Sequence, residues 1–158
     1  EDDFLSSLAR AEYSRARCEG GLSIEVLRAL HPALQRRVLR IFWAEETGTA
    51  QITEGYNLPA RHVIHTVGPI VIGALTDRHR AQLASCYRSC LSLAAEHGLR
   101  SIAFCCISTG EFHFPNAAAA EIAVREVLDF LTRDTSIERV VFNVFKDEDR
   151  HIYERLLS

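Results

Sequence analysis

The stretch that most constrains the fold of this chain is Ser101–Asn116, SIAFCCISTGEFHFPN. It opens with a continuous apolar run from Ile102 to Ile107, breaks at a Ser-Thr-Gly sequence, and leads into a helical pattern that Pro115 opens. An apolar run of this length between helical patterns is typical of a buried strand in a parallel sheet. The loop after such a strand lies at the carboxyl edge of the sheet, where α/β folds bind ligands.

The small residues of this loop are Ser108, Thr109 and Gly110. Small side chains let backbone N–H groups approach a ligand closely, and the N-terminus of a following helix favours negative charge. The residues alone therefore predict an anion- or phosphate-binding loop. An ordinary strand-to-helix turn without a ligand explains them equally well, so both interpretations stay open at this point.

Length and composition bound the other functions. A chain of 158 residues fits one domain with a sizeable core. Its net charge of -3 gives no field that attracts nucleic acid, and no apolar run approaches the ~18 residues that a membrane span needs. The chain begins without Met or a signal-peptide pattern, and its five cysteines fall mostly in apolar patterns. We expect a fragment from a reducing, cytoplasmic setting.

Two segments with different patterns divide the chain at about residues 46 and 47. Residues 1–46 show helical spacing only, with Ser23 predicted to cap the second helix and Pro32 to open the third. Residues 47–158 alternate strands and helices, which predicts an α/β fold with a mostly parallel sheet. The expected strands are 50–56, 61–67, 101–107 and 138–145, and the expected helices are 77–97, 116–133 and 148–157, the first of them capped by Asp77.

Three blocks of the second segment stand in a specific order, TGTAQITEGYNLPARHVIHTVGP, SIAFCCISTGEFHFPNAAAAEIAV and VVFNVFKDEDRHIYERLL. Together they resemble the C-terminal two thirds of a macrodomain, the ADP-ribose-binding module. The sequences CCISTGEFHFPN and FNVFKDED are closest to the bacterial zinc-dependent branch, whose members resemble protein-ADP-ribose hydrolases. The resemblance implies a macrodomain-like α/β/α sandwich that is incomplete at its N-terminal side and preceded by a short all-helical segment.

The same resemblance implies the ligand and its contacts. ADP-ribose, free or attached to a protein, would be the partner. Ser108, Thr109, Gly110, Glu111 and Phe112 would surround the diphosphate and distal ribose. The resemblance also places Phe145 beside the adenine.

The family's first two strands, its glycine-rich catalytic loop and its zinc ligands have no counterpart that we can find in residues 1–46. We therefore expect no cofactor and no metal ligand in this chain, assign no catalytic residue, and expect hydrolysis to be impaired. The sequence LSIEVLRALHPALQRRVLR instead weakly resembles the helical region that follows the catalytic domain of bacterial tRNA(Ile)-lysidine synthases. The chain would then join two unrelated pieces at about residues 45–47, either as a natural fusion or as an artefact. An RNA contact by Arg36, Arg37 and Arg40 is less favoured than a solvated helix face.

Several reactive side chains admit a functional and a structural interpretation. For His62 and His65, hydrogen-bonded strand histidines are favoured over metal ligands. Packing is favoured over metal binding for Cys86 and Cys90, and for Cys105 and Cys106, which point to opposite faces of a strand. A capping role is favoured for the acidic run 147–149. Glu111 and His113 flank the loop and are the best candidates for a general acid or base. A role as ordinary solvent-exposed loop residues is slightly favoured over a catalytic one.

Three functions remain after these observations: a protein-ADP-ribose hydrolase, a module that binds ADP-ribose without turnover, and a fragment related to the tRNA-modifying enzyme. The resemblance also has a consequence for the sheet. In complete macrodomains another strand separates those that match 61–67 and 101–107. We expect these two strands to pair directly, or an unpaired strand edge to promote self-association.

Overall fold

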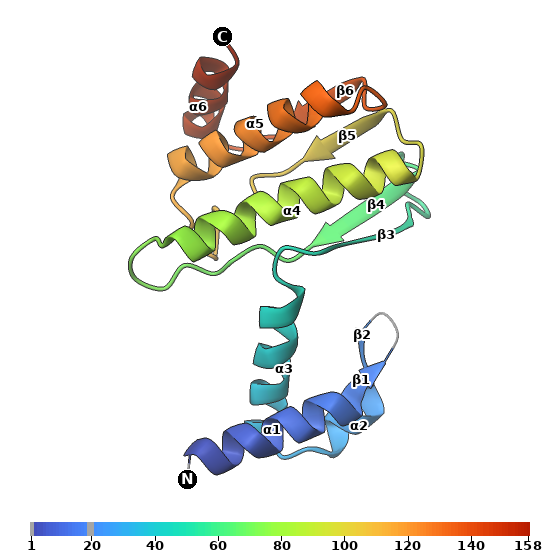
Figure 1. Cartoon of the computed structure of the whole chain (residues 1–158), viewed down its shortest axis with the longest axis vertical. Coiled ribbons are helices and arrows are strands. Elements are labelled where there is room, and N and C mark those ends of the chain that lie inside the picture. The colour runs from blue at the N-terminus through green and yellow to red at the C-terminus, as the bar shows by residue number, and fades with distance from the viewer. Residues whose placement is uncertain (1, 19–20) are drawn as a thin grey trace. The chain divides into compact units, whose positions relative to one another are not determined.

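The computed structural model describes residues 2–18 and 21–158 (Figure 1). The chain divides into two compact units, Glu1–Glu46 and Thr47–Ser158. The two hydrophobic cores described below lie one in each unit and share no residue.

The first unit is mainly helical. Its elements are α1 (Asp2–Ala16), β1 (Arg17–Cys18), β2 (Gly21–Leu22), α2 (Ile24–Ala29) and α3 (Pro32–Glu46). Ser23 caps α2 as predicted, since its hydroxyl accepts the Val26 N–H at 3.4 Å. The prediction of helices alone is wrong, because β1 and β2 pair as a short antiparallel ladder. The Ser23 N–H donates to the Ala16 carbonyl at 2.8 Å and closes this reversal between α1 and α2.

A small core holds the first unit together. Tyr13, Ala16 and Val38 are buried between α1 and α3. The Tyr13 hydroxyl donates to Glu45 Oε2 at 2.5 Å, and the Arg17 guanidinium lies 5.8 Å from the centre of the Tyr13 ring. The aromatic ring thus packs in the core while its hydroxyl remains hydrogen-bonded, as buried tyrosines require.

The second unit contains every strand and helix that the sequence predicts. Its elements are β3 (Ala50–Glu54), β4 (His62–Thr66), α4 (Asp77–Glu96), β5 (Ser101–Phe104), α5 (Asn116–Arg133), β6 (Arg139–Phe142) and α6 (Asp147–Leu157). The strands are shorter than expected. The predicted cap of α4 is also wrong by one residue, because Thr76 is the N-cap and its hydroxyl accepts the His79 N–H at 3.4 Å.

The strands form separate two-stranded sheets rather than one mostly parallel sheet. β3 and β4 pair antiparallel, while β5 and β6 pair parallel. Among the described residues β4 does not pair with β5, so the expected direct pairing of these strands is wrong. Helix α4 contacts both sheets instead: Cys86 Sγ donates to the Val67 carbonyl at 3.4 Å, and the Tyr87 ring lies 5.0 Å from the Phe104 ring.

The main core lies between these sheets and the helices. α4 and α5 lie side by side (Figure 1), and Leu83 and Phe114 are among its most buried members. Phe104 of β5 is buried against this layer, but Ala103 and Cys105 on the opposite face of the same stretch are exposed. The predictions that this stretch is buried on both faces and that Cys105 packs in the core are therefore wrong, because only one of its faces meets a helix.

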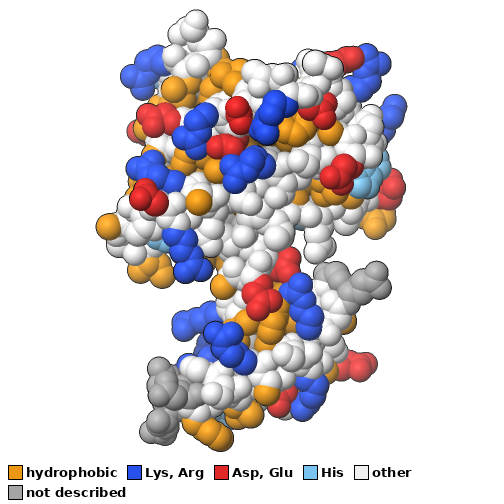
Figure 2. All heavy atoms as spheres, in the orientation of Figure 1, with side chains coloured by type: hydrophobic (Ala, Val, Ile, Leu, Met, Phe, Trp, Pro, Cys, Tyr) orange, Lys and Arg blue, Asp and Glu red, His pale blue; other side chains and the backbone are white. Residues whose placement is uncertain are grey.

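The surface agrees with the modest net charge. Figure 2 shows basic and acidic side chains interspersed over the visible face of the second unit. Within residues 2–18 and 21–158, no helix combines the length and the apolar character that crossing a membrane requires.

Candidate functional site

The loop between β5 and α5 folds back on itself through short-range hydrogen bonds. The Phe114 N–H donates to the Ser108 carbonyl and the His113 N–H to the Gly110 carbonyl, both at 3.0 Å. The Thr109 hydroxyl donates to the Cys106 carbonyl at 3.2 Å. Ser108 and His113 have φ values of +66° and +56°, a conformation that non-glycine residues adopt rarely and often at functional sites.

The loop after β4 packs directly against this loop. A Cβ atom on Gly68 would come within 2.1 Å of Ser108 Oγ, so only glycine permits the approach. The Val71 N–H donates to the Phe112 carbonyl at 2.8 Å and joins the two loops a second time. Ser108 Oγ is buried and has no hydrogen-bond partner among the described residues. The contact between Gly68 and Ser108 has only a weak signal in the sequence, the Gly68-Pro69 pair that ends the preceding strand.

The structure gathers five of the six predicted site residues on this one loop. Ser108, Thr109 and Phe112 are half-buried, whereas Gly110 and Glu111 are exposed. A Cβ atom on Gly110 would meet nothing within 4 Å, so this residue faces open space.

The sixth predicted residue, Phe145, comes from a different segment. It lies three positions after the end of β6, and its side chain is 98% exposed. Because β5 and β6 run parallel, Phe145 and the loop after β5 follow the carboxyl ends of neighbouring strands.

Two helix N-termini lie together at this edge. The Asn116 amide at the start of α5 donates to Asp149 Oδ1 in the first turn of α6 at 2.5 Å, and Asp149 is 6% exposed. Asp149 thus joins two helices, a role that the predicted capping function of residues 147–149 does not include. Sequence reasoning missed this pair because its members are far apart in the chain.

The two helix N-termini differ electrostatically. The first turn of α6 carries three carboxylates, while that of α5 carries none, and no side chain of the described residues caps α5 at Pro115. Its first N–H groups and its helix dipole therefore favour an anion at the end of the loop.

The thiols near the core are poor nucleophiles. Burial raises the pKa of Cys90 to about 12, and burial also raises the pKa values of Cys86 and Cys106. Each remains a neutral thiol at physiological pH, and only the thiolate attacks or binds metal.

The described residues also do not fit a zinc site. Among them, no three histidine, cysteine, aspartate or glutamate side chains converge as ligands. His65 Nε2 lies 3.0 Å from Thr53 Oγ1 on the antiparallel pair of strands, so this ring already has a hydrogen-bond partner.

Comparison with known proteins decides the family. A sequence model described as the Macro domain matches residues 11–123. The chain belongs to the macrodomain family. The predicted α/β macrodomain fold is therefore confirmed, and the matched range includes residues 11–46 of the first unit as well as much of the second.

Two curated macrodomain proteins illustrate the similarity. A protein-ADP-ribose hydrolase of Treponema medium is 56% identical over 114 residues, which cover 72% of this chain and 44% of that protein. The ADP-ribose glycohydrolase MACROD2 of Xenopus laevis is 48% identical over 140 residues, which cover 88% of this chain and 33% of that protein. The chain thus spans less than half the length of these relatives, which come from a bacterium and a vertebrate.

A solved structure supports the same conclusion. The Trypanosoma brucei macrodomain in complex with ADP-ribose superposes with a TM-score of 0.66 at 37% sequence identity. The comparison covers 88% of this chain and 57% of that one.

Proposed function

We propose that this macrodomain binds ADP-ribose, free or attached to a protein, through the loop Ser108–Phe112. The observation that carries the proposal is the conformation of this loop. Ser108 has a left-handed backbone conformation, Gly110 faces open space, and the loop leads into the N-terminus of α5, which no side chain of the described residues caps. Backbone N–H groups and a helix N-terminus are suited to a diphosphate. The ligand of the Trypanosoma brucei structure supports the choice of ADP-ribose.

Gly110→Glu tests the site. Gly110 has an ordinary φ and open space around its Cβ position, so a glutamate causes no backbone strain and places a carboxylate where we expect the diphosphate. We expect calorimetric titration to show at least about a tenfold weaker Kd for ADP-ribose, or ~1.4 kcal/mol. Gly21→Glu is a matched control, because Gly21 is also unstrained and open but lies in the first unit. Equal affinity of the Gly110→Glu variant and the parent chain would refute the site.

We further propose that the chain binds ADP-ribose but hydrolyses ADP-ribosylated protein poorly. The alternative is an active hydrolase that removes ADP-ribose from a protein side chain, and the names of the relatives support it. Glu111 and His113 are exposed on the loop and are the candidates for proton handling. Release of ADP-ribose from a modified peptide, abolished by Glu111→Gln with binding retained, would support the hydrolase. Metal analysis separates the two proposals as well, since one tightly held zinc per chain would favour the zinc-dependent enzyme.

Self-association remains a separate proposal. Within the described residues β4 and β5 each pair on one side only, and unpaired strand edges favour association. Sedimentation at increasing protein concentration tests it. We propose no nucleic-acid partner, because basic and acidic side chains are interspersed over the face of the second unit that Figure 2 shows. We also propose a cytoplasmic setting, the reducing compartment that cysteines in apolar patterns favour. An RNA affinity that falls steeply with salt would instead favour the fragment related to tRNA(Ile)-lysidine synthase, with Arg36, Arg37 and Arg40 as its contacts.

A further inference from the structure

The buried carboxylate of Asp149 lies near both ends of the candidate loop. It belongs to the first turn of α6 and is 6% exposed. Beyond the C-terminal end of the loop, it accepts a hydrogen bond at 2.5 Å from the amide of Asn116, the first residue of α5. At the N-terminal end, burial raises the pKa of the Cys106 thiol and the negative charge of Asp149 raises it further, so the carboxylate lies near Cys106 as well. Cys106 stands two residues before Ser108.

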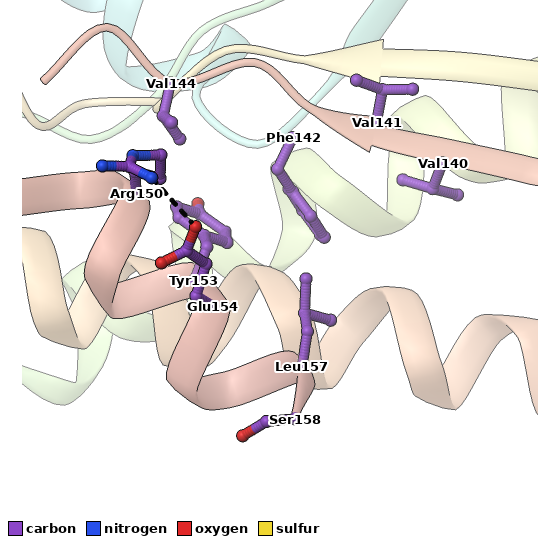
Figure 3. Close-up of a pocket in the computed structure, with 9 residues that line it drawn as sticks. All are labelled: Val140, Val141, Phe142, Val144, Arg150, Tyr153, Glu154, Leu157 and Ser158. Carbon is purple, nitrogen blue, oxygen red and sulfur yellow. Dashed lines mark hydrogen bonds and ion pairs between the residues drawn. The ribbon is translucent and has the colours of Figure 1, made fainter. Parts of the chain in front are cut away.

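The packing of α6 on the sheet fixes the position of Asp149. Tyr153 follows Asp149 by four residues, and both are buried on the same face of the helix. The Tyr153 ring stacks on the Phe142 ring of β6 with centroids 4.8 Å apart. Figure 3 shows Phe142 pointing from β6 toward α6. Asp149 is therefore held in place relative to the sheet, and it can hold Asn116 in turn.

The bond to Asp149 also determines what the Asn116 side chain does. Asparagine side chains at helix starts readily accept hydrogen bonds from nearby backbone N–H groups. Here the Asn116 amide is engaged by Asp149 instead, and among the described residues no side chain caps α5 at Pro115. The first N–H groups of α5, at the end of the candidate loop, are thus left for an anionic ligand.

We propose that Asp149 is a positioning residue for the ADP-ribose site. By holding the Asn116 amide, it keeps the start of α5 and the adjoining loop Ser108–Phe112 in the geometry that presents backbone N–H groups to the diphosphate. A carboxylate repels a diphosphate, so a favourable effect of Asp149 on affinity acts through Asn116 and not through contact with the ligand. This role of Asp149 rests on the proposed function of the loop.

Two substitutions at Asp149 separate the hydrogen bond from the charge. Asp149→Ala removes the acceptor, and we expect calorimetric titration to show a Kd for ADP-ribose at least about fivefold weaker. Asp149→Asn removes the charge but leaves an oxygen that accepts the bond from Asn116, so its Kd should stay within about twofold of that of the parent chain. If charge alone mattered, both variants would lose a repulsive carboxylate and bind more tightly.

Asp147→Ala is the matched control. Asp147 lies in the same turn of α6, but its side chain is 87% exposed and pairs with Arg150 at 3.3 Å. This variant removes a carboxylate without touching the bond to Asn116, so the Kd should stay within about twofold of that of the parent chain. Thermal unfolding checks that each variant is folded during the titration. Asn116→Ala removes the donor and should weaken binding as Asp149→Ala does, so the test does not depend on one variant.

The parent chain and Gly110→Glu, titrated alongside, distinguish the possible failures. If Gly110→Glu weakens binding but Asp149→Ala binds as the parent chain does, the loop is the site and the positioning role is refuted. Equal losses in Asp149→Ala and Asp149→Asn, or in Asp149→Ala and Asp147→Ala, would refute that role too. If the parent chain binds no ADP-ribose, or Gly110→Glu binds it equally well, the proposed function fails and the positioning role fails with it.

Discussion

Phe145 is the residue whose exposure packing does not explain. Its side chain is 98% exposed, more than that of Tyr56 at 87%, another exposed aromatic of the second unit. A phenyl ring this exposed buries little apolar surface, but beside the proposed ADP-ribose site it would provide a flat apolar surface on which a base can stack. Its position after the carboxyl end of β6 fits that role.

We expect Phe145→Ala to weaken ADP-ribose binding by about 1–3 kcal/mol, the usual contribution of stacking between a base and an aromatic side chain. The free energy of unfolding should stay the same, because the ring contacts no core. Calorimetric titration measures the affinity, and thermal unfolding checks the stability. Tyr56→Ala serves as the control for loss of an exposed ring. Similar losses of affinity in both variants would argue against stacking on Phe145.

At the scale of elements, α4 and α5 are joined by one buried carboxylate. Glu126 of α5 is 7% exposed and accepts hydrogen bonds from Arg88 of α4 at 2.6 Å and from its neighbour Arg125 at 2.9 Å. Burial by itself would raise the pKa of Glu126. The hydrogen bonds from Arg125 and Arg88 outweigh burial and leave the pKa below its ordinary value of 4.5. The ionised carboxylate is therefore the form that the folded protein favours.

A lowered folded pKa gives a definite sign to the pH dependence. The stabilisation by Glu126 is present above its ordinary pKa and is lost as the pH falls through the lower folded value. We expect Glu126→Gln to reduce the free energy of unfolding at pH 7 by about 1–3 kcal/mol. The difference from the parent should shrink below about pH 4. Urea unfolding at several pH values measures this, with exposed Glu121→Gln as the control. A loss that does not change with pH would contradict the ionic origin.

The elements show how far the sequence can predict this fold. Periodicity located α4 and α5 well, because a buried stripe recurs along each helix. It did not predict how the strands pair, since the apolar pattern of a strand does not encode its neighbour. Cys105 looks apolar in the sequence but is exposed, because its face meets no helix.

The candidate site also has one part that the sequence predicts and one part that only the folded chain reveals. The loop Ser108–Gly110 could be predicted because its glycine and small residues follow a strand. The contact of Gly68 with Ser108 and the bond from Asn116 to Asp149 join residues distant in sequence, and only the folded chain brings them together.

At the scale of the whole molecule, two separate cores predict two unfolding events. Val38 lies in the core of Glu1–Glu46, and Leu83 in that of Thr47–Ser158; both are fully buried. The first unit is small, and units of that size are only marginally stable. We therefore expect calorimetry of the full chain to resolve a weaker transition for the first unit and a stronger one for the second.

Two core variants assign these transitions. Val38→Ala should lower only the midpoint temperature of the first unit's transition, because it reduces that unit's free energy of unfolding by about 1–3 kcal/mol. Leu83→Ala should lower only the midpoint temperature of the second unit's transition. Its free energy of unfolding should fall by about 2–5 kcal/mol, which includes the cost of the cavity left behind. Because the two sites share no core, their effects should add in the double variant. A single transition that both variants shift alike would instead show that the units unfold as one cooperative body.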